Sequence, residues 1–235
     1  MVFERIDRQR VHEQVAARIR DAIFSGEFGP GEQLPTEREL SASFGVSRAS
    51  VREAMRALEA QGLLMPGPGS QFPPLVADDL SRPVQELLGH LMRLQRVRVE
   101  DLSELRRAVE PAAVMLAASD PNEDALGEAR SALQAMQEPE VTVLDFRAAD
   151  LRFHIALVAA SRNEAMHLIM LAVRHTLERR LAERLSQLDD PRHTFATLIT
   201  EHQQLLDAVE RGDGAHAAEL VRGHIERFYG SAPRS

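Results

Sequence analysis

The sequence predicts a mainly α protein in two parts, an N-terminal winged helix-turn-helix followed by an all-α bundle of six to seven helices. Aromatic residues make up only 4% of the 235-residue chain, although 44% of it is hydrophobic. The core is therefore aliphatic, which suits packed helices better than sheets. Apolar residues recur at helical spacing along most of the chain. The main interruption is a stretch rich in Gly and Pro, residues 67–83.

This stretch divides the chain into an expected DNA-binding domain, residues 1–76, and an expected ligand-binding and dimerisation domain, residues 77–235. The net charge is −8, and every basic residue is Arg because the sequence contains no Lys. Residues 1–76 carry a net charge of −1 and residues 77–235 a net charge of −7. The planar guanidinium of Arg suits phosphate, carboxylate and guanine. The first part is thus nearly neutral with clustered arginines, and the second is acidic.

Several classes of protein are excluded by composition. The chain has no Cys, which excludes disulfides, thiolate catalysis and Cys-based zinc sites. No apolar run reaches the length of about 18 residues that a membrane-spanning helix needs. The N-terminal stretch MVFERIDRQR lacks the apolar segment of a signal peptide. We therefore expect a soluble, cytoplasmic protein with no membrane partner.

Three helices and a hairpin are expected in the N-terminal part. Four apolar residues spaced by four mark a first helix over 11–23. Thr36 and Glu39 form a capping box that begins a second helix. Ser47 caps a third, and two short apolar runs over 63–76 pair as a hairpin. This order matches a helix-turn-helix with a wing; the alternative is a small helical domain with an ordinary hairpin.

A row of arginines favours the DNA-binding interpretation. Arg48, Arg52 and Arg56 are spaced by four on the third helix. A recognition helix presents its N-terminal end to the major groove, where Arg binds guanine O6 and N7 or a phosphate. Ser47 and Ser50 are small enough for close approach. Arg56 has acidic neighbours and can instead be a solvated surface charge, so we assign DNA contact to Arg48 and Arg52.

Residues 31–64, GEQLPTERELSASFGVSRASVREAMRALEAQGLL, resemble the winged helix-turn-helix of the GntR superfamily of bacterial transcription regulators. LPTEREL, GVSR-x-x-VREA and AL-x-x-x-GL stand in the order and spacing of that family. The resemblance implies a regulator, most often a repressor, that binds double-stranded operator DNA as a homodimer. It implies that one arginine of the EREL segment and the polar residues at the start of the third helix contact DNA: Arg38, Ser47, Arg48, Ser50, Arg52.

The wing departs from the family pattern. In MPGPGSQF, Gly67 stands where family members often carry a basic residue, and Pro66 removes a strand N–H. We therefore do not expect a charged side chain of the wing to contact the minor groove. Gly69 remains the candidate for a contact with the DNA backbone.

The second part predicts seven helices and contains a candidate metal site. Asp150 and His154 stand at i and i+4, so they share one helix face. His202 and His224 lie on two later helices. Three neutral imidazoles and one carboxylate suit Zn, Ni, Mn or Fe with positions left for water or ligand. In a chain with nine His such a pair also arises by chance, and four unrelated polar residues are the alternative.

This C-terminal region resembles the FadR-type effector domain called FCD, which is found in one GntR subgroup. The resemblance implies that the Asp and three His bind a divalent metal and that Arg106, the Arg of R-x-x-x-E, holds a small carboxylate ligand. Asn163 matches an Asn that follows the D-x-x-x-H helix and is a second candidate for ligand contact. Arg107 is the alternative to Arg106, and His216 is a weaker alternative metal ligand.

The leading functional hypothesis is therefore a repressor whose operator affinity is modulated by a small organic acid. A metal-dependent hydrolase or oxygenase is the alternative, because an open metal coordination position can activate water. The sequence places no Glu as an obvious general base and has no H-E-x-x-H motif, so no catalytic residues are expected. A third interpretation retains the metal as a structural element without a sensing role.

Overall fold

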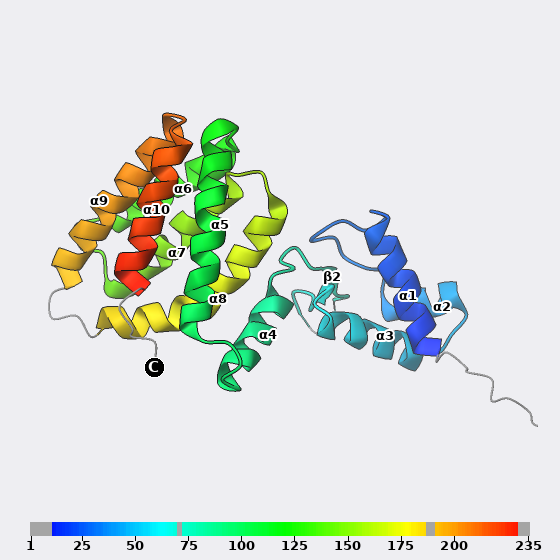
Figure 1. Ribbon diagram of the computed structural model, residues 1–235. Coiled ribbons are helices and arrows are strands. Elements are labelled where there is room, and N and C mark those ends of the chain that lie inside the picture. The colour runs from blue at the N-terminus through cyan, green and yellow to red at the C-terminus, as the bar shows by residue number, and fades with distance from the viewer. Residues whose placement is uncertain (1–10, 70–71, 187–190, 230–235) are drawn as a thin grey trace, which may run out of the picture. The chain divides into compact units, whose positions relative to one another are not determined.

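The computed structural model describes residues 11–69, 72–186 and 191–229 (Figure 1). Side chains are described for these residues except 178–186, 191–192 and 228–229. The chain divides into two compact units, Met1–Pro83 and Val84–Ser235. Ten helices and one two-stranded sheet are present in the described residues. The mainly helical fold class predicted from composition is confirmed.

The first unit contains a helix-turn-helix followed by a short antiparallel hairpin. In the hairpin Leu64 pairs with Val76 and Met65 with Leu75, and an isolated bridge joins Gln33 to Leu75. The paired strands form the predicted wing. The elements are α1 (Val11–Phe24), α2 (Glu37–Phe44), α3 (Arg48–Ala60), β1 (Leu64–Met65) and β2 (Leu75–Val76).

Local hydrogen bonds set the ends of α2 and α3. The Thr36 hydroxyl accepts from the backbone N–H of Glu39, and the Glu39 carboxylate accepts from that of Thr36, which completes the predicted capping box. Helix α2 ends at Gly45, whose φ of 67° is left-handed. Ser47 then accepts from the N–H of Ser50 and caps α3. The turn between the two helices is therefore encoded by adjacent caps.

The core of the first unit fixes which face of α3 points outward. Val51, Ala54, Met55 and Leu58 are buried against residues of α1 and the hairpin. Because these four follow the 3.6-residue period, the arginines of α3 lie beside the buried stripe rather than in it, and they are exposed. The predicted buried stripe of the third helix is confirmed.

Seven helices follow the hairpin in the described residues, and the first of them, α4, begins later than expected. The sequence predicts a helix over 79–95, whereas α4 spans Arg82–Arg93, because the Asp79 carboxylate accepts from the N–H and hydroxyl of Ser81 in a turn before the helix. The sequence predicts the other six helices over 99–118, 122–138, 142–160, 163–188, 191–211 and 213–229, and the ends agree to within two residues except at 188, which lies outside the described residues. They are α5 (Val99–Ser119), α6 (Glu123–Met136), α7 (Val143–Ala159), α8 (Glu164–Ser186), α9 (Pro191–Glu210) and α10 (Gly214–Tyr229).

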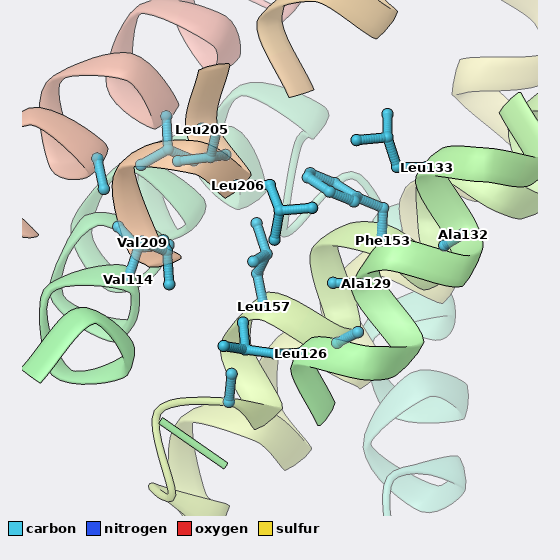
Figure 2. Packing of buried hydrophobic residues seen from close by; sticks show 14 of the residues in the cluster. Val114, Leu126, Ala129, Ala132, Leu133, Phe153, Leu157, Leu205, Leu206 and Val209 are labelled. Atoms are coloured by element: carbon cyan, nitrogen blue, oxygen red, sulfur yellow. The ribbon is translucent and has the colours of Figure 1, made fainter. Parts of the chain in front are cut away.

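A largely aliphatic core holds α5, α6, α7, α9 and α10 together (Figure 2). Helix α10 packs along α5, α6 along α7, and α7 along α8. Phe146 and Phe195 stack with ring centroids 4.0 Å apart and tie α7 to α9. The buried side chains converge from α5, α6, α7 and α9 and include Val114, Leu126, Leu133, Phe153, Leu157, Leu205 and Leu206. In the described part of the chain, no helix has the length and apolar character needed to cross a membrane.

Candidate functional site

The structure brings the four predicted metal ligands together inside the second unit. Asp150 and His154 come from α7, His202 from α9 and His224 from α10. Each offers one ligand atom, and these atoms all lie within 4.8 Å of one another. All four side chains are buried. Residues 74 positions apart in sequence thus meet at one point, which a chance D-x-x-x-H pair would not produce.

Two of the three innermost distances match those of a coordination sphere, and the distance between Asp150 and His154 is longer. The Nε2 atoms of His154 and His202 are 3.1 Å apart, and Asp150 Oδ1 lies 3.8 Å from the first and 3.4 Å from the second. Ligand atoms about 2.1 Å from a metal stand roughly 3.0–3.4 Å from one another. His202 Nδ1 has no hydrogen-bond partner in the described part of the chain, so the cluster side alone engages this ring. The donor set fits a divalent transition metal.

Carboxylates support two of the imidazole rings from outside. Glu110 Oε2 lies 3.4 Å from His154 Nδ1, and Glu201 Oε2 lies 2.7 Å from His224 Nδ1. Metal-binding histidines generally have such a partner on the second nitrogen, because it fixes the ring orientation and tautomer. Neither carboxylate is among the residues that the sequence predicts for this site. Glu201 is adjacent to His202 in sequence, and this adjacency is the sequence feature that places a carboxylate near the site.

A buried ion-pair network lies beside the cluster. Arg106 Nε donates to Glu110 Oε1 at 2.7 Å, and Arg174 donates to both oxygens of Glu110 at 2.9–3.2 Å. Arg174 Nη1 also lies 3.7 Å from Asp150 Oδ2. Arg107 instead forms a half-exposed pair with a surface Glu. Arg174 is not among the predicted ligand-binding residues, although it is the only charged residue in the apolar run LIMLAVR of α8.

The other two candidates lie in different settings. Asn163 caps α8, because its side-chain oxygen accepts from the N–H of Met166 at 3.1 Å. That oxygen is therefore engaged in the helix end. His216 is exposed at the start of α10, and its N–H donates to Asp213. It lies outside the group of four.

Burial and charge set the protonation of the cluster. Burial lowers the pKa of His154 well below its ordinary value of 6.5, and it does the same for His202, where the neighbouring imidazoles add to the effect. Burial also raises the pKa of Asp150. Burial alone would raise the pKa of Glu110, but Arg106 and Arg174 hold it well below its usual range. The imidazoles of His154 and His202 are thus neutral, which is the form that binds metal.

The predicted DNA contacts in the first unit lie at or near the start of α3. Arg38 and Arg48 are exposed. Ser47 caps the helix, and its hydroxyl oxygen lies 3.0 Å from that of half-buried Ser50. Arg52 is exposed but paired, because its Nε and Nη2 donate to the two oxygens of Glu37. The pair between Arg52 and Glu37 is not predicted from the sequence.

A groove borders these residues. It has a volume of about 550 Å³ and is lined by residues of α2, α3 and the wing, including Arg38, Arg52 and Arg56. Gly69 forms the wing turn, where its carbonyl accepts from the N–H of Phe72. A Cβ at Gly67 would overlap the Pro73 carbonyl and lie 2.9 Å from that of Phe72. This crowding explains why a basic side chain is absent from position 67.

Comparison with known proteins identifies the family. A model described as bacterial regulatory proteins of the gntR family matches residues 11–72, and the FCD domain matches residues 101–227. The uncharacterized HTH-type transcriptional regulator Rv0494 of Mycobacterium tuberculosis is 32% identical over 95% of this chain and 90% of its own. The chain belongs to the GntR family and carries an FCD domain.

Further comparisons agree with this assignment of the GntR-family chain. The HTH-type transcriptional regulator LutR of Bacillus subtilis is 33% identical over 86% of this chain and 92% of its own. A solved structure of Streptococcus agalactiae GntR shares the fold with a TM-score of 0.69 and 24% identity, and the match covers 94% of this chain and 100% of the other. The protein is therefore a DNA-binding transcription regulator and not an enzyme, as the sequence predicts.

Proposed function

We propose that this GntR-family regulator is a homodimeric repressor whose operator affinity is set by a small organic acid at a metal site in the second unit. The observation that carries the proposal is the convergence of Asp150, His154, His202 and His224 beside two buried arginines. Repression, and its release by ligand, follow from the resemblance to the GntR superfamily.

The charges of the site favour an anionic ligand. Two guanidinium groups, Arg106 and Arg174, balance two carboxylates, Glu110 and Asp150, and the imidazoles of His154 and His202 are neutral. A divalent cation would therefore leave about two uncompensated positive charges in a buried site, and such charges are costly unless they are paired. A carboxylate would supply the pairing. Zn, Ni, Mn and Fe all suit three imidazoles and a carboxylate, and the metal would provide the coordination positions that a ligand oxygen occupies.

The proposed DNA surface is the start of α3 with Arg38, Arg48 and Arg52. Arg48 and Arg52 are exposed beside the buried stripe, and helix N-termini favour phosphate. In a homodimer, two such helices would enter successive major grooves about 34–36 Å apart on a near-palindromic operator. Dimerisation also compensates for the small number of cations in each copy. Ser47, Ser50 and Gly69 would add contacts to the DNA backbone.

Ligand binding need change operator affinity only modestly. A coupling free energy of about 1–3 kcal/mol corresponds to a change of roughly 5–150-fold. By reciprocity, DNA must weaken ligand binding by the same factor if ligand weakens DNA binding. This reciprocity distinguishes a sensing site from a purely structural metal.

The test measures operator binding directly. DNA selected by this protein from a random pool serves as the operator, and gel shifts are run with Zn²⁺ and with a panel of hydroxy acids, sugar acids and dicarboxylates. We expect Arg48→Ala and Arg52→Ala each to abolish specific binding, whereas Arg211→Ala, which removes an exposed charge from the second unit, should not. One or more carboxylates should release the wild-type protein. Unchanged binding by both α3 variants, or a protein that no carboxylate releases, contradicts the proposal.

A further inference from the structure

Glu201 makes the shortest contact between any cluster imidazole and a carboxylate outside the group of four, among the described residues. Its Oε2 lies 2.7 Å from His224 Nδ1. Glu201 stands on α9 directly before His202, and His224 stands on α10. The contact therefore joins the two helices that each supply one late histidine. Operator binding by the first unit does not explain this contact between Glu201 and His224.

The chemistry of this contact selects one form of the ring. An ionised carboxylate only accepts hydrogen bonds, so His224 Nδ1 must be the donor. In a neutral imidazole the other nitrogen, Nε2, then carries the lone pair. The His224 ring lies with its centroid 4.9 Å from that of His154 and 4.8 Å from that of His202. The lone pair is thus available on a ring that lies against the other candidate ligands.

Arg227 holds the second oxygen of the same carboxylate. Its Nε donates to Glu201 Oε1 at 2.8 Å. Its guanidinium lies over Gly223, where a Cβ would come within 2.9 Å of Nη1. The Glu201 side chain is only 17% exposed, while that of Arg227 is 59% exposed. The carboxylate is therefore held from both sides, by an imidazole inside and by a guanidinium at the surface.

We propose that Glu201 is a positioning residue that holds His224 as the Nδ1–H tautomer and thereby directs its Nε2 lone pair to the centre of the cluster. The half of this inference that concerns metal affinity rests on the proposed metal site. The part that concerns the tautomer of His224 applies to the metal-free protein and does not depend on the proposed metal site. Glu110 differs, because its oxygens are shared among Arg106, Arg174 and His154.

The first experiment reads the tautomer. Nitrogen-15 NMR of the metal-free protein with labelled histidine distinguishes the Nδ1–H tautomer, the Nε2–H tautomer and the imidazolium, and His224→Gln assigns the signal. We expect His224 as Nδ1–H in the wild type, with loss of that preference in Glu201→Ala. Glu201→Gln should retain most of it, because the amide oxygen still accepts from Nδ1–H. A wild-type His224 in either of the other two forms overturns the inference.

The second experiment measures Zn²⁺ affinity with a competing chelator. Removal of such a partner typically costs 10–100-fold in metal affinity, so we expect Glu201→Ala to weaken Zn²⁺ binding by about that factor and Glu201→Gln by less. Glu219→Ala, which removes an exposed charge from α10, should bind as the wild type does. A Glu201→Ala variant with a lowered melting temperature but wild-type affinity shows a packing role and overturns the inference. A wild-type protein that binds no metal rejects the proposed site, while the tautomer experiment still decides the role of Glu201.

Discussion

Arg52 is clamped by Glu37 through two parallel hydrogen bonds, from Nε at 2.7 Å and from Nη2 at 2.6 Å. The pair joins the first turn of α2 to the recognition helix, and the bonds from Arg52 lower the pKa of the Glu37 carboxyl. A bidentate pair fixes the plane of the guanidinium. It leaves the Nη1 donors and one Nη2 proton for another acceptor, so in the proposed complex Arg52 would be oriented before DNA binds.

Glu37→Gln should therefore reduce specificity more than affinity. The variant loses a negative charge beside the arginines proposed to contact DNA, which should strengthen binding to any duplex and steepen its dependence on salt by roughly one phosphate equivalent. It also releases Arg52, which lowers the ratio of operator to random-DNA affinity. Fluorescence anisotropy at several salt concentrations measures both. Glu59→Gln removes a charge from the same groove without freeing Arg52, so it should change only the dependence of DNA binding on salt. Equal loss of specificity in the two variants would contradict a positioning role for Glu37.

The buried carboxylate Glu110 should be the most sensitive position of α5. Glu110→Gln leaves Arg106 and Arg174 without their common counter-ion in a site that is almost fully buried. Removal of one partner from a buried pair costs about 3–5 kcal/mol. Glu104→Gln, whose surface pair with Arg107 is 3.7 Å long, should cost less than about 1 kcal/mol. Urea unfolding followed by circular dichroism compares the two, and similar losses would show that the network contributes little.

Local patterns predicted much of the fold, and long-range contacts explain what they missed. The capping box of Thr36 and Glu39 and the buried stripe of α3 involve residues within a few positions, so spacing alone reveals them. The helices of the second unit follow from periodicity and breakers. Arg174 reaches Glu110 across 64 positions and Arg52 reaches Glu37 across 15, and neither pair has a local motif. The four candidate ligands were found because D-x-x-x-H is local and the family resemblance supplied the distant histidines.

Two glycines with left-handed backbone should respond differently to alanine. Gly45 has φ 67° with open space around its position, so Gly45→Ala should pay only the conformational cost of about 1–2 kcal/mol. Gly62 has φ 72°, and a Cβ there would also overlap the ring of Pro83. Because a proline ring cannot rotate away, Gly62→Ala should cost at least twice as much. Denaturation of both variants checks the order, and equal losses would contradict the packing of Pro83 on Gly62.

Bound metal should stabilise the second unit, and this stabilisation should depend on the four proposed metal-binding residues. A ligand at about 100 times its Kd adds roughly 2.7 kcal/mol to the free energy of unfolding. Thermal melts of chelator-treated protein with added Zn²⁺ should therefore show a clear rise in Tm. Asp150→Asn should remove most of the rise, because it deletes the only carboxylate of the group of four, while His216→Gln should keep it. A rise that survives Asp150→Asn would place the metal elsewhere.

The metal-free protein should lose stability as the pH falls through the histidine range. Burial holds the pKa of His154 and His202 well below 6.5 in the folded state, whereas the unfolded chain takes up protons on both rings below that pH. Stability rises with pH wherever the unfolded state binds more protons, so Tm should fall between about pH 7 and 5. Glu110 acts in the same direction below 4.5, and the raised pKa of Asp150 opposes it.

Melting temperatures across this range, with and without Zn²⁺, check the expectation. Bound metal occupies the imidazole lone pairs and must be displaced by protons, so the loaded protein should also lose metal as the pH falls. His216→Gln should leave both profiles unchanged because His216 is exposed. The decisive comparison is His202→Phe. It removes one buried titrating ring, so its metal-free Tm should depend less steeply on pH than that of the wild type. A slope as steep as the wild-type one would show that His202 is not held neutral by its burial.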